Sequence, residues 1–223
     1  MTLPPVELHW PLTTERLTIR PATAADLPLV FAYRRLGVVS EWLPTRPTDQ
    51  EAFVERLRRP ERLAVTYVLE LDGVLIGDLY LAVEDAAAQL EVAAQATATT
   101  AEIGWVLDPA YTGRGFATEA AAELLRLCFE DLGVRRVVAQ CFADNTPSWH
   151  LMERLGMRRE SSTRAATLHR SGRWLDGLAY GILAGEWRGR AGATQDAGAP
   201  RTIVPSADRS PTSARPDGPG SYA

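Results

Sequence analysis

Hydrophobic side chains follow a strand-like pattern along seven short segments of this 223-residue chain. Residues 16–21 alternate apolar and polar side chains up to Pro21, which is typical of a strand with one buried face. Residues 137–142 are mostly apolar, as expected of a strand inside a core. The predicted strands are residues 16–21, 64–71, 74–83, 101–107, 137–142, 158–169 and 175–183.

Apolar residues recur at helical spacing along four further segments, which are residues 23–35, 48–58, 118–132 and 146–155. Thr48 is the expected N-cap of the second helix, and Thr146 that of the fourth, because Pro147 suits the position after a cap. Gly133 directly follows the third helix, where glycine commonly ends a helix. The order of elements is strand, two helices, three strands, helix, strand, helix and two strands.

Short connections join most of these elements. Asp72-Gly73 between two strands indicates a tight hairpin. Residues 37–47 and 84–100 are predicted to be irregular. We therefore expect one mixed α/β domain in residues 1–188. Residues 189–223 are rich in small and polar residues and have few large apolar side chains, so we expect a disordered tail.

Composition narrows the possible functions. The net charge of −4 argues against nucleic acid as a partner, and no apolar run is long enough to span a membrane. No signal peptide is evident, so the cytoplasm is the expected compartment. Cys128 and Cys141 are separated from the three scattered histidines and are expected to be buried small hydrophobes rather than metal ligands. All 24 basic residues are arginine, which excludes a lysine-containing phosphate loop and Schiff-base catalysis.

A glycine-rich turn stands between the strand of residues 101–107 and the helix that follows. It reads Thr112-Gly113-Arg114-Gly115-Phe116-Ala117-Thr118. Glycine permits positive φ and close approach of a ligand to the backbone, and successive N–H groups at a helix N-terminus bind phosphate oxygens. The turn therefore predicts a diphosphate site, although glycines also occur in ordinary strand-to-helix turns. A dinucleotide-binding oxidoreductase fits poorly, because Thr118 stands where that motif requires glycine or alanine, and several strands precede the turn.

The order of elements, together with five segments, resembles the GNAT superfamily of acyl-CoA N-acyltransferases. The closer resemblance is to its branch of ribosomal-protein N-terminal (alanine/serine) acetyltransferases. The segments are residues 12–21, 102–107, the glycine turn, residues 145–157 and residues 174–187. The family loop usually begins with glutamine or arginine, and Thr112 departs from this while Gly115 and Ala117 match. The resemblance implies a mostly antiparallel sheet of about seven strands with flanking helices, splayed between the fourth strand (residues 102–107) and the fifth (residues 137–142).

The resemblance also implies how acetyl-CoA would be held. The main chain of residues 113–118 would bind its diphosphate. A bulge at Gly104 would open the sheet for the pantetheine arm, which would then bond the main chain of Trp105, Val106 and Leu107. The amide of Asn145 would hold the same arm, unless this residue only forms the turn. No metal is implied.

The catalytic groups are inferred from position. Glu102 precedes Gly104 by two residues, so both lie on one face of the strand, and Glu102 is the candidate general base. The alternative is a carboxylate paired with an arginine. Ser148 is the candidate donor to the leaving thiolate, or an inert residue of the first helical turn. Trp42, Arg164 and His169 are candidates for an acceptor pocket, with core or surface roles as the alternative for each.

These features predict an N-acetyltransferase that transfers an acetyl group from acetyl-CoA to a primary amine by direct attack in a ternary complex. A protein N-terminus, an amino acid, a polyamine or a drug-like amine fits the same frame. Specificity would lie in the first two helices, residues 37–47 and the last hairpin. A non-catalytic domain that binds or senses acyl-CoA is the alternative, and either protein is expected to be a monomer or a homodimer.

Overall fold

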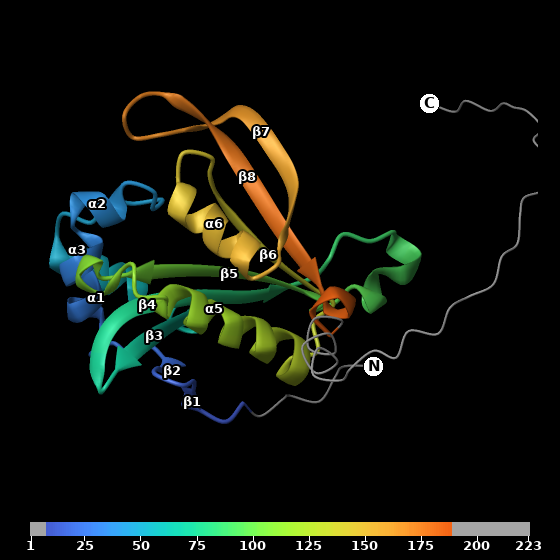
Figure 1. Ribbon diagram of the computed structural model, residues 1–223, viewed down its shortest axis with the longest axis horizontal. Helices are drawn as coiled ribbons and strands as arrows, with labels where there is room; N and C mark the ends of the chain where they lie inside the picture. Colours follow the sequence, from blue (N-terminus) through green and yellow to red (C-terminus); the bar gives the residue numbers. More distant parts are fainter. Residues whose placement is uncertain (1–7, 189–223) are drawn as a thin grey trace, which may run out of the picture.

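A computed structural model describes residues 8–188 of the chain. Eight strands form one mixed sheet in the order β1-β2-β3-β4-β5-β6-β8-β7, in which only β5 and β6 run parallel (Figure 1). The strands are β1 Leu12–Thr13, β2 Thr18–Pro21, β3 Thr66–Leu71, β4 Val74–Glu84, β5 Thr100–Leu107, β6 Arg136–Phe142, β7 Arg158–Leu168 and β8 Trp174–Leu183. The expected mixed, mostly antiparallel sheet is confirmed. Its eighth strand, β1, is two residues long and therefore too short to show a hydrophobic pattern.

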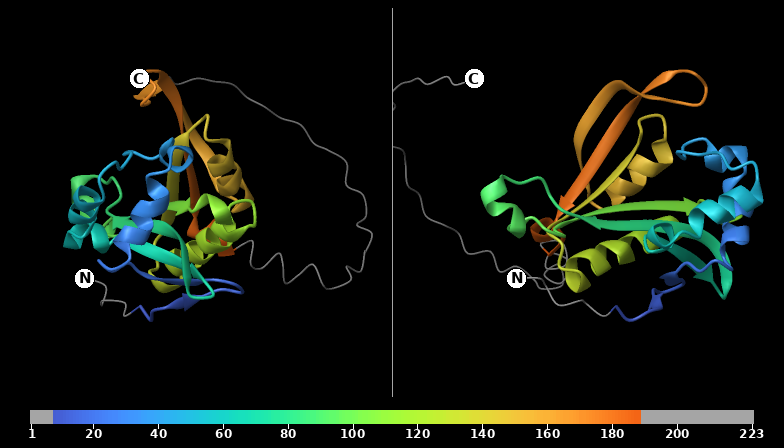
Figure 2. Two further views of the ribbon diagram at one scale, coloured as in Figure 1. Left: turned by 90° about the vertical axis from the view of Figure 1, so that its left-hand side faces the viewer. Right: turned by 180° about the vertical axis from the view of Figure 1, so that it is seen from behind.

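Helices cover both faces of the sheet. The helical elements are α1 Leu27–Arg34, α2 Gly37–Ser40, α3 Gln50–Leu57, α4 Pro60–Leu63, α5 Phe116–Arg126 and α6 Thr146–Arg154, with short 3₁₀ segments η1 Leu90–Gln95 and η2 Pro109–Tyr111 and a π turn η3 Leu127–Asp131. Figure 2 shows α1 and α3 on one side of the sheet and α5 and α6 on the other. No helix among residues 8–188 has the length and apolar character needed to cross a bilayer.

Two apolar clusters hold these layers together. The larger lies between the sheet and the helices α5 and α6, and includes Ile103, Leu124 and Met152, each at most 3% exposed. The smaller lies beneath α1 and α3 and includes Phe31, Phe53 and Val106. Side chains of β5 alternate between the two clusters. Ala101 and Ile103 belong to the cluster beside α5, whereas Val106 belongs to the cluster beside α1.

Local signals placed the long elements correctly, but several ends and short elements differ. The first helix begins at Leu27 and not at residue 23, α4 was not predicted, and η1 lies in residues 84–100, which were predicted to be irregular. Asp72 and Gly73 adopt φ of 51° and 77° between β3 and β4, as the hairpin signal predicted. Asp49, not Thr48, caps α3, since its side chain accepts a hydrogen bond from the Ala52 N–H at 2.7 Å. The helix predicted from residue 118 begins at Phe116. Residues 37–47, predicted to be irregular, contain the single turn of α2.

The predicted tail, residues 189–223, lies outside the described residues. The division of the chain into residues 1–188 and a disordered tail therefore stays a prediction.

Candidate active site

The sheet opens between β5 and β6. The two strands pair over only three positions, Thr100 with Arg136, Ala101 with Val137 and Glu102 with Val138. Beyond Glu102 the main chain of β5 has no strand partner on this side, and Figure 1 shows β5 diverging from β6 and β8 like the arms of a V. The predicted splay is confirmed. The bulge expected at Gly104 is absent from the pairing with β4, because the register of β4 and β5 runs without a shift from Gly77–Leu107 to Glu84–Thr100.

A cavity of about 1320 Å³ lies at this opening. Pockets for one small ligand commonly measure about 300–1,000 Å³, so this volume suits two substrates. All of the predicted catalytic and coenzyme-binding residues line it except Arg114; the lining members are Glu102, Trp105, Val106, Leu107, Thr112, Gly113, Gly115, Phe116, Ala117, Thr118, Asn145 and Ser148. Residues from distant parts of the sequence thus meet at one site.

The glycine turn carries unused main-chain donors beside the cavity. Gly113 and Gly115 have φ of 73° and 84°, which residues with a side chain rarely adopt. The N–H groups of residues 113–118 have no hydrogen-bond acceptor within residues 8–188, and the first bond of α5 runs from the Glu119 N–H to the Gly115 carbonyl. The partial positive charge of a helix N-terminus adds to these six donors. This arrangement is suited to an anion with several oxygens.

Arg16 contacts this turn, a role that the sequence analysis did not predict. Its Nη1 donates to the Arg114 carbonyl at 3.2 Å, and its guanidinium lies 4.6 Å from the centre of the Phe116 ring. Arg16 also forms an ion pair of 2.6 Å with Glu119. The carboxylate of Glu119 in the first turn of α5 is thereby neutralised by Arg16. The guanidinium of Arg114 packs on the same Phe116 ring, at 4.9 Å, which explains why Arg114 does not line the cavity.

Glu102 and Gly104 lie on one face of β5, as their spacing predicted. Gly104 pairs with Tyr80 of β4, so the glycine leaves open space beside the tyrosine ring. Burial and the nearby negative charge of Glu84 raise the pKa of Glu102 above the ordinary glutamate value. Gln140 Nε2 donates weakly to its Oε1 at 3.4 Å. No arginine in the described part of the chain forms an ion pair with Glu102, so the alternative of a carboxylate–arginine pair is not observed.

On the other side of the opening, Asn145 directly precedes α6 and Ser148 lies in the first turn of this helix. Asn145, not Thr146, occupies the N-cap position, but its side chain makes no capping hydrogen bond. Burial raises the pKa of the Cys141 thiol to about 11, and the nearby Ser148 hydroxyl acts in the opposite direction. Cys141 was expected to be a core residue, but it is only half-buried and lines the cavity. Cys128 is buried, as predicted.

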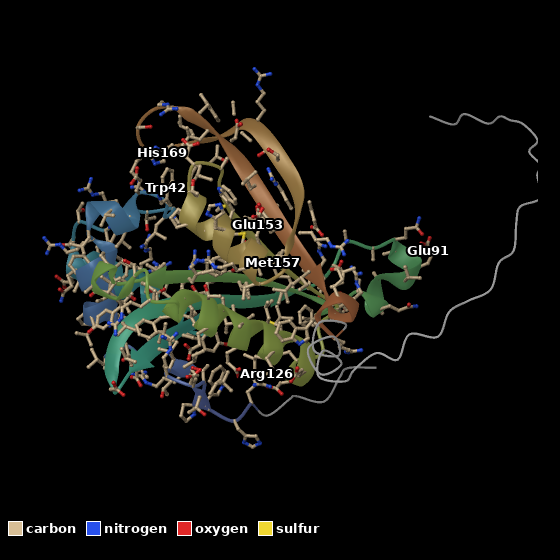
Figure 3. All side chains as sticks on the ribbon, in the orientation of Figure 1. Trp42, Glu91, Arg126, Glu153, Met157 and His169 are labelled. Atoms are coloured by element: carbon tan, nitrogen blue, oxygen red, sulfur yellow. The ribbon has the colours of Figure 1, made fainter. Side chains whose placement is uncertain are left out.

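An aromatic cluster connects the segment after α2 with β6 and the β7–β8 hairpin. The Trp42 ring lies 5.5 Å from the His169 ring and 5.8 Å from the Phe142 ring. His169 Nε2 also lies 3.0 Å from the Glu41 carbonyl oxygen. Figure 3 shows Trp42 and His169 meeting where the β7–β8 hairpin reaches the segment after α2. Trp42 lines the cavity, as the sequence suggested, whereas neither His169 nor Arg164 lines it.

The fold and the site define an α/β protein whose sheet is parted beside a helix N-terminus with free main-chain donors. A family model described as an acetyltransferase (GNAT) domain matches residues 16–158. The chain therefore belongs to the GNAT family and is an N-acetyltransferase, an acyltransferase.

Individual relatives agree with this assignment. The chain is 30% identical to the uncharacterized N-acetyltransferase YnaD of Bacillus subtilis, over 79% of this chain and 98% of YnaD. A GNAT-family acetyltransferase structure from Bacillus anthracis is 29% identical with a TM-score of 0.65, covering 78% of this chain and 98% of that one. RimL, a ribosomal L7/L12 alpha-N-protein acetyltransferase solved in complex with coenzyme A, shares the fold at 19% identity and a TM-score of 0.63, over 76% of this chain and 95% of RimL.

Proposed function

We propose that this chain transfers the acetyl group of acetyl-CoA to a primary amine by direct attack within a ternary complex. The observation that carries the proposal is the row of six unused amides at residues 113–118, five of which belong to residues that line a cavity large enough for two substrates. A diphosphate supplies several anionic oxygens, so it matches such a row. RimL, which shares the fold, was solved with coenzyme A.

The free edge of β5 suits the pantetheine arm and the thioester. Main-chain groups from Ile103 onward lack a partner in β6, so amide-bearing ligands can pair with Trp105, Val106 and Leu107 in place of a strand. One N–H of this edge would stabilise the oxyanion, and a donor of this kind is worth about 3 kcal/mol in comparable enzymes. The side chain of Asn145 makes no capping bond and is available to the same arm.

Glu102 would take the proton of the incoming amine, through water. The amine nitrogen forms a bond to the acetyl carbon, the carbon–sulfur bond breaks, and the thiolate leaves. The pKa of Glu102 is raised toward the pH at which an enzyme works, and this makes the carboxylate a better general base. Ser148 would donate a hydrogen bond to the departing sulfur, as its contact with the Cys141 thiol illustrates.

The acceptor is proposed as a protein N-terminus or a small-molecule amine. RimL, which shares the fold, is an alpha-N-protein acetyltransferase, and this supports the first of these. The alternative of a silent acyl-CoA-binding domain is disfavoured by the available carboxylate at Glu102, which no arginine within residues 8–188 neutralises.

The test combines thiol release with mass spectrometry. Purified protein is incubated with isotopically labelled acetyl-CoA and a panel of peptides and small amines. We expect labelled acetyl-amine products and one free thiol per acetyl group transferred. Binding of acetyl-CoA without transfer to any amine would support the silent binding domain instead, and the absence of both binding and transfer would refute the proposal.

A further inference from the structure

An arginine that lines the cavity is fixed by a buried carboxylate. Arg34, the last residue of α1, donates to Asp78 of β4 through Nε at 2.9 Å and also through Nη2. Asp78 is 1% exposed, and the buried Tyr33 hydroxyl donates to its Oδ1 at 2.5 Å. Burial opposes the charge of Arg34, but the Asp78 carboxylate raises its pKa overall, so the guanidinium stays charged. A guanidinium held on two donors has little freedom to turn.

One edge of this guanidinium is unused. Within the described residues, Nη1 of Arg34 has no hydrogen-bond partner. No side-chain nitrogen or oxygen that is buried in this part of the chain lacks a partner, so Nη1 must be exposed to solvent. The Arg34 side chain is 22% exposed, and Arg34 lines the cavity. Nη1 therefore offers two N–H donors from a rigid support.

The position of Arg34 relative to Glu102 indicates which part of a bound acceptor the Nη1 donors would contact. Asp78 pairs with Val106, and Tyr80 with Gly104, so Arg34 and Glu102 are held at opposite ends of one sheet face with the glycine between them. Four strand residues span about 13 Å. An amine above Gly104 would thus have Glu102 on one side and the Arg34 edge on the other. The part of the acceptor molecule that lies beside the Arg34 edge should therefore be a group that accepts hydrogen bonds.

Charge selects among such groups. The Arg34–Asp78 pair is neutral as a unit, so its free edge acts as a hydrogen-bond donor more than as a net positive charge. A neutral carbonyl oxygen suits it better than a carboxylate. We propose that Arg34 binds a carbonyl oxygen next to the reacting amine, and thereby selects α-amino amides, the chemistry of a peptide N-terminus, over simple alkylamines. This inference rests on the proposed acetyl transfer.

The experiment is a cycle of two substrates and several enzymes, with free alanine as a third amine for comparison. Alaninamide and sec-butylamine have similar shapes, but only the first carries a carbonyl. Their kcat/KM values are measured with wild type, Arg34→Lys and the matched control Arg35→Lys. Arg35 neighbours Arg34 but is exposed, packs on Phe31 and does not line the cavity. Comparing the ratio of the two substrates between enzymes cancels their different basicities.

Lysine keeps the charge opposite Asp78 but loses the second edge of the guanidinium. We expect the alaninamide preference to fall about tenfold or more in Arg34→Lys, as for the loss of a hydrogen bond to a charged group, and to persist in Arg35→Lys. The double variant Arg34→Gln with Asp78→Asn removes both charges together and should show the same loss. This double variant replaces Arg34→Lys as the test if the lysine variant does not fold.

The outcomes separate the two proposals. An equal alaninamide preference in all enzymes, or none in wild type, would overturn the role of Arg34 while leaving acetyl transfer intact. A preference for free alanine over alaninamide would also overturn it, because the carboxylate would then be the recognised group. Failure of wild type to acetylate any of the three amines, despite binding acetyl-CoA, would refute the proposed function itself.

Discussion

Replacing Ala117 by proline removes one of the proposed diphosphate donors at little expected cost to the fold. Ala117 is the second residue of α5, and its N–H has no acceptor in residues 8–188. Proline already occupies the same helical position in α1, as Pro28, and in α6, as Pro147. Because no protein hydrogen bond is lost in the first turn of a helix, the free energy of unfolding should change by about 1 kcal/mol or less.

The ligand, in contrast, loses a donor to a charged oxygen. Such a hydrogen bond is worth about 1.5–3 kcal/mol, which corresponds to roughly 10- to 100-fold in Kd. Isothermal titration calorimetry of CoA with Ala117→Pro should therefore show this loss, while thermal unfolding stays near that of wild type. Ala117→Ser is the matched control, because it keeps the N–H and should bind CoA as wild type does. Unchanged CoA affinity in a folded Ala117→Pro protein would refute the assignment of this amide to the diphosphate.

Three further predictions concern catalysis, stability and the tail. Glu102→Gln should lower kcat/KM about 100-fold or more with little change in CoA affinity. In wild type, activity should fall as pH drops below the raised pKa of Glu102, and a pH–rate profile with the same acidic limb in Glu102→Gln would remove it as the base. Hydrogen bonds from Arg20 lower the pKa of Asp26 from 3.8 to about 2, so its contribution to stability is present above pH 3.8 and lost toward pH 2. Asp26→Asn should therefore cost about 2 kcal/mol at pH 7, and urea unfolding should show that deficit shrinking in acid; a constant deficit would contradict the linkage. Deleting residues 189–223 should leave the melting temperature and the acetylation rate unchanged, and a large loss of folded protein would contradict their expected lack of a core.

The features that could be predicted from the sequence are set by residues close to one another along the chain. Gly113 and Gly115 signal positive φ by their type alone, and Glu102 and Gly104 share a face because a strand repeats every second residue. The family resemblance added the splay, which local patterns do not encode. Cap positions were less certain, because Thr48 and Asp49 are both good caps and only the observed bond to Ala52 decides between them.

The features that were missed depend on contacts across the fold. Arg16 reaches the Arg114 carbonyl across 98 positions of sequence, and His169 reaches Glu41 across 128. The pair of Arg34 and Asp78 gives no local signal either, since an arginine at a helix end and an aspartate in a strand are ordinary residues when considered alone. A buried aspartate in the middle of an apolar strand is the one feature that could have drawn attention to a partner.

The central claim is that main-chain amides at the start of α5 hold the diphosphate of acetyl-CoA beside the parted strands β5 and β6. A crystal structure of the protein with acetyl-CoA tests it most directly. The account predicts diphosphate oxygens at hydrogen-bond distance from the N–H groups of residues 113–118, and the acetyl group near Gly104. A diphosphate bound elsewhere, with these amides facing only water, would contradict it.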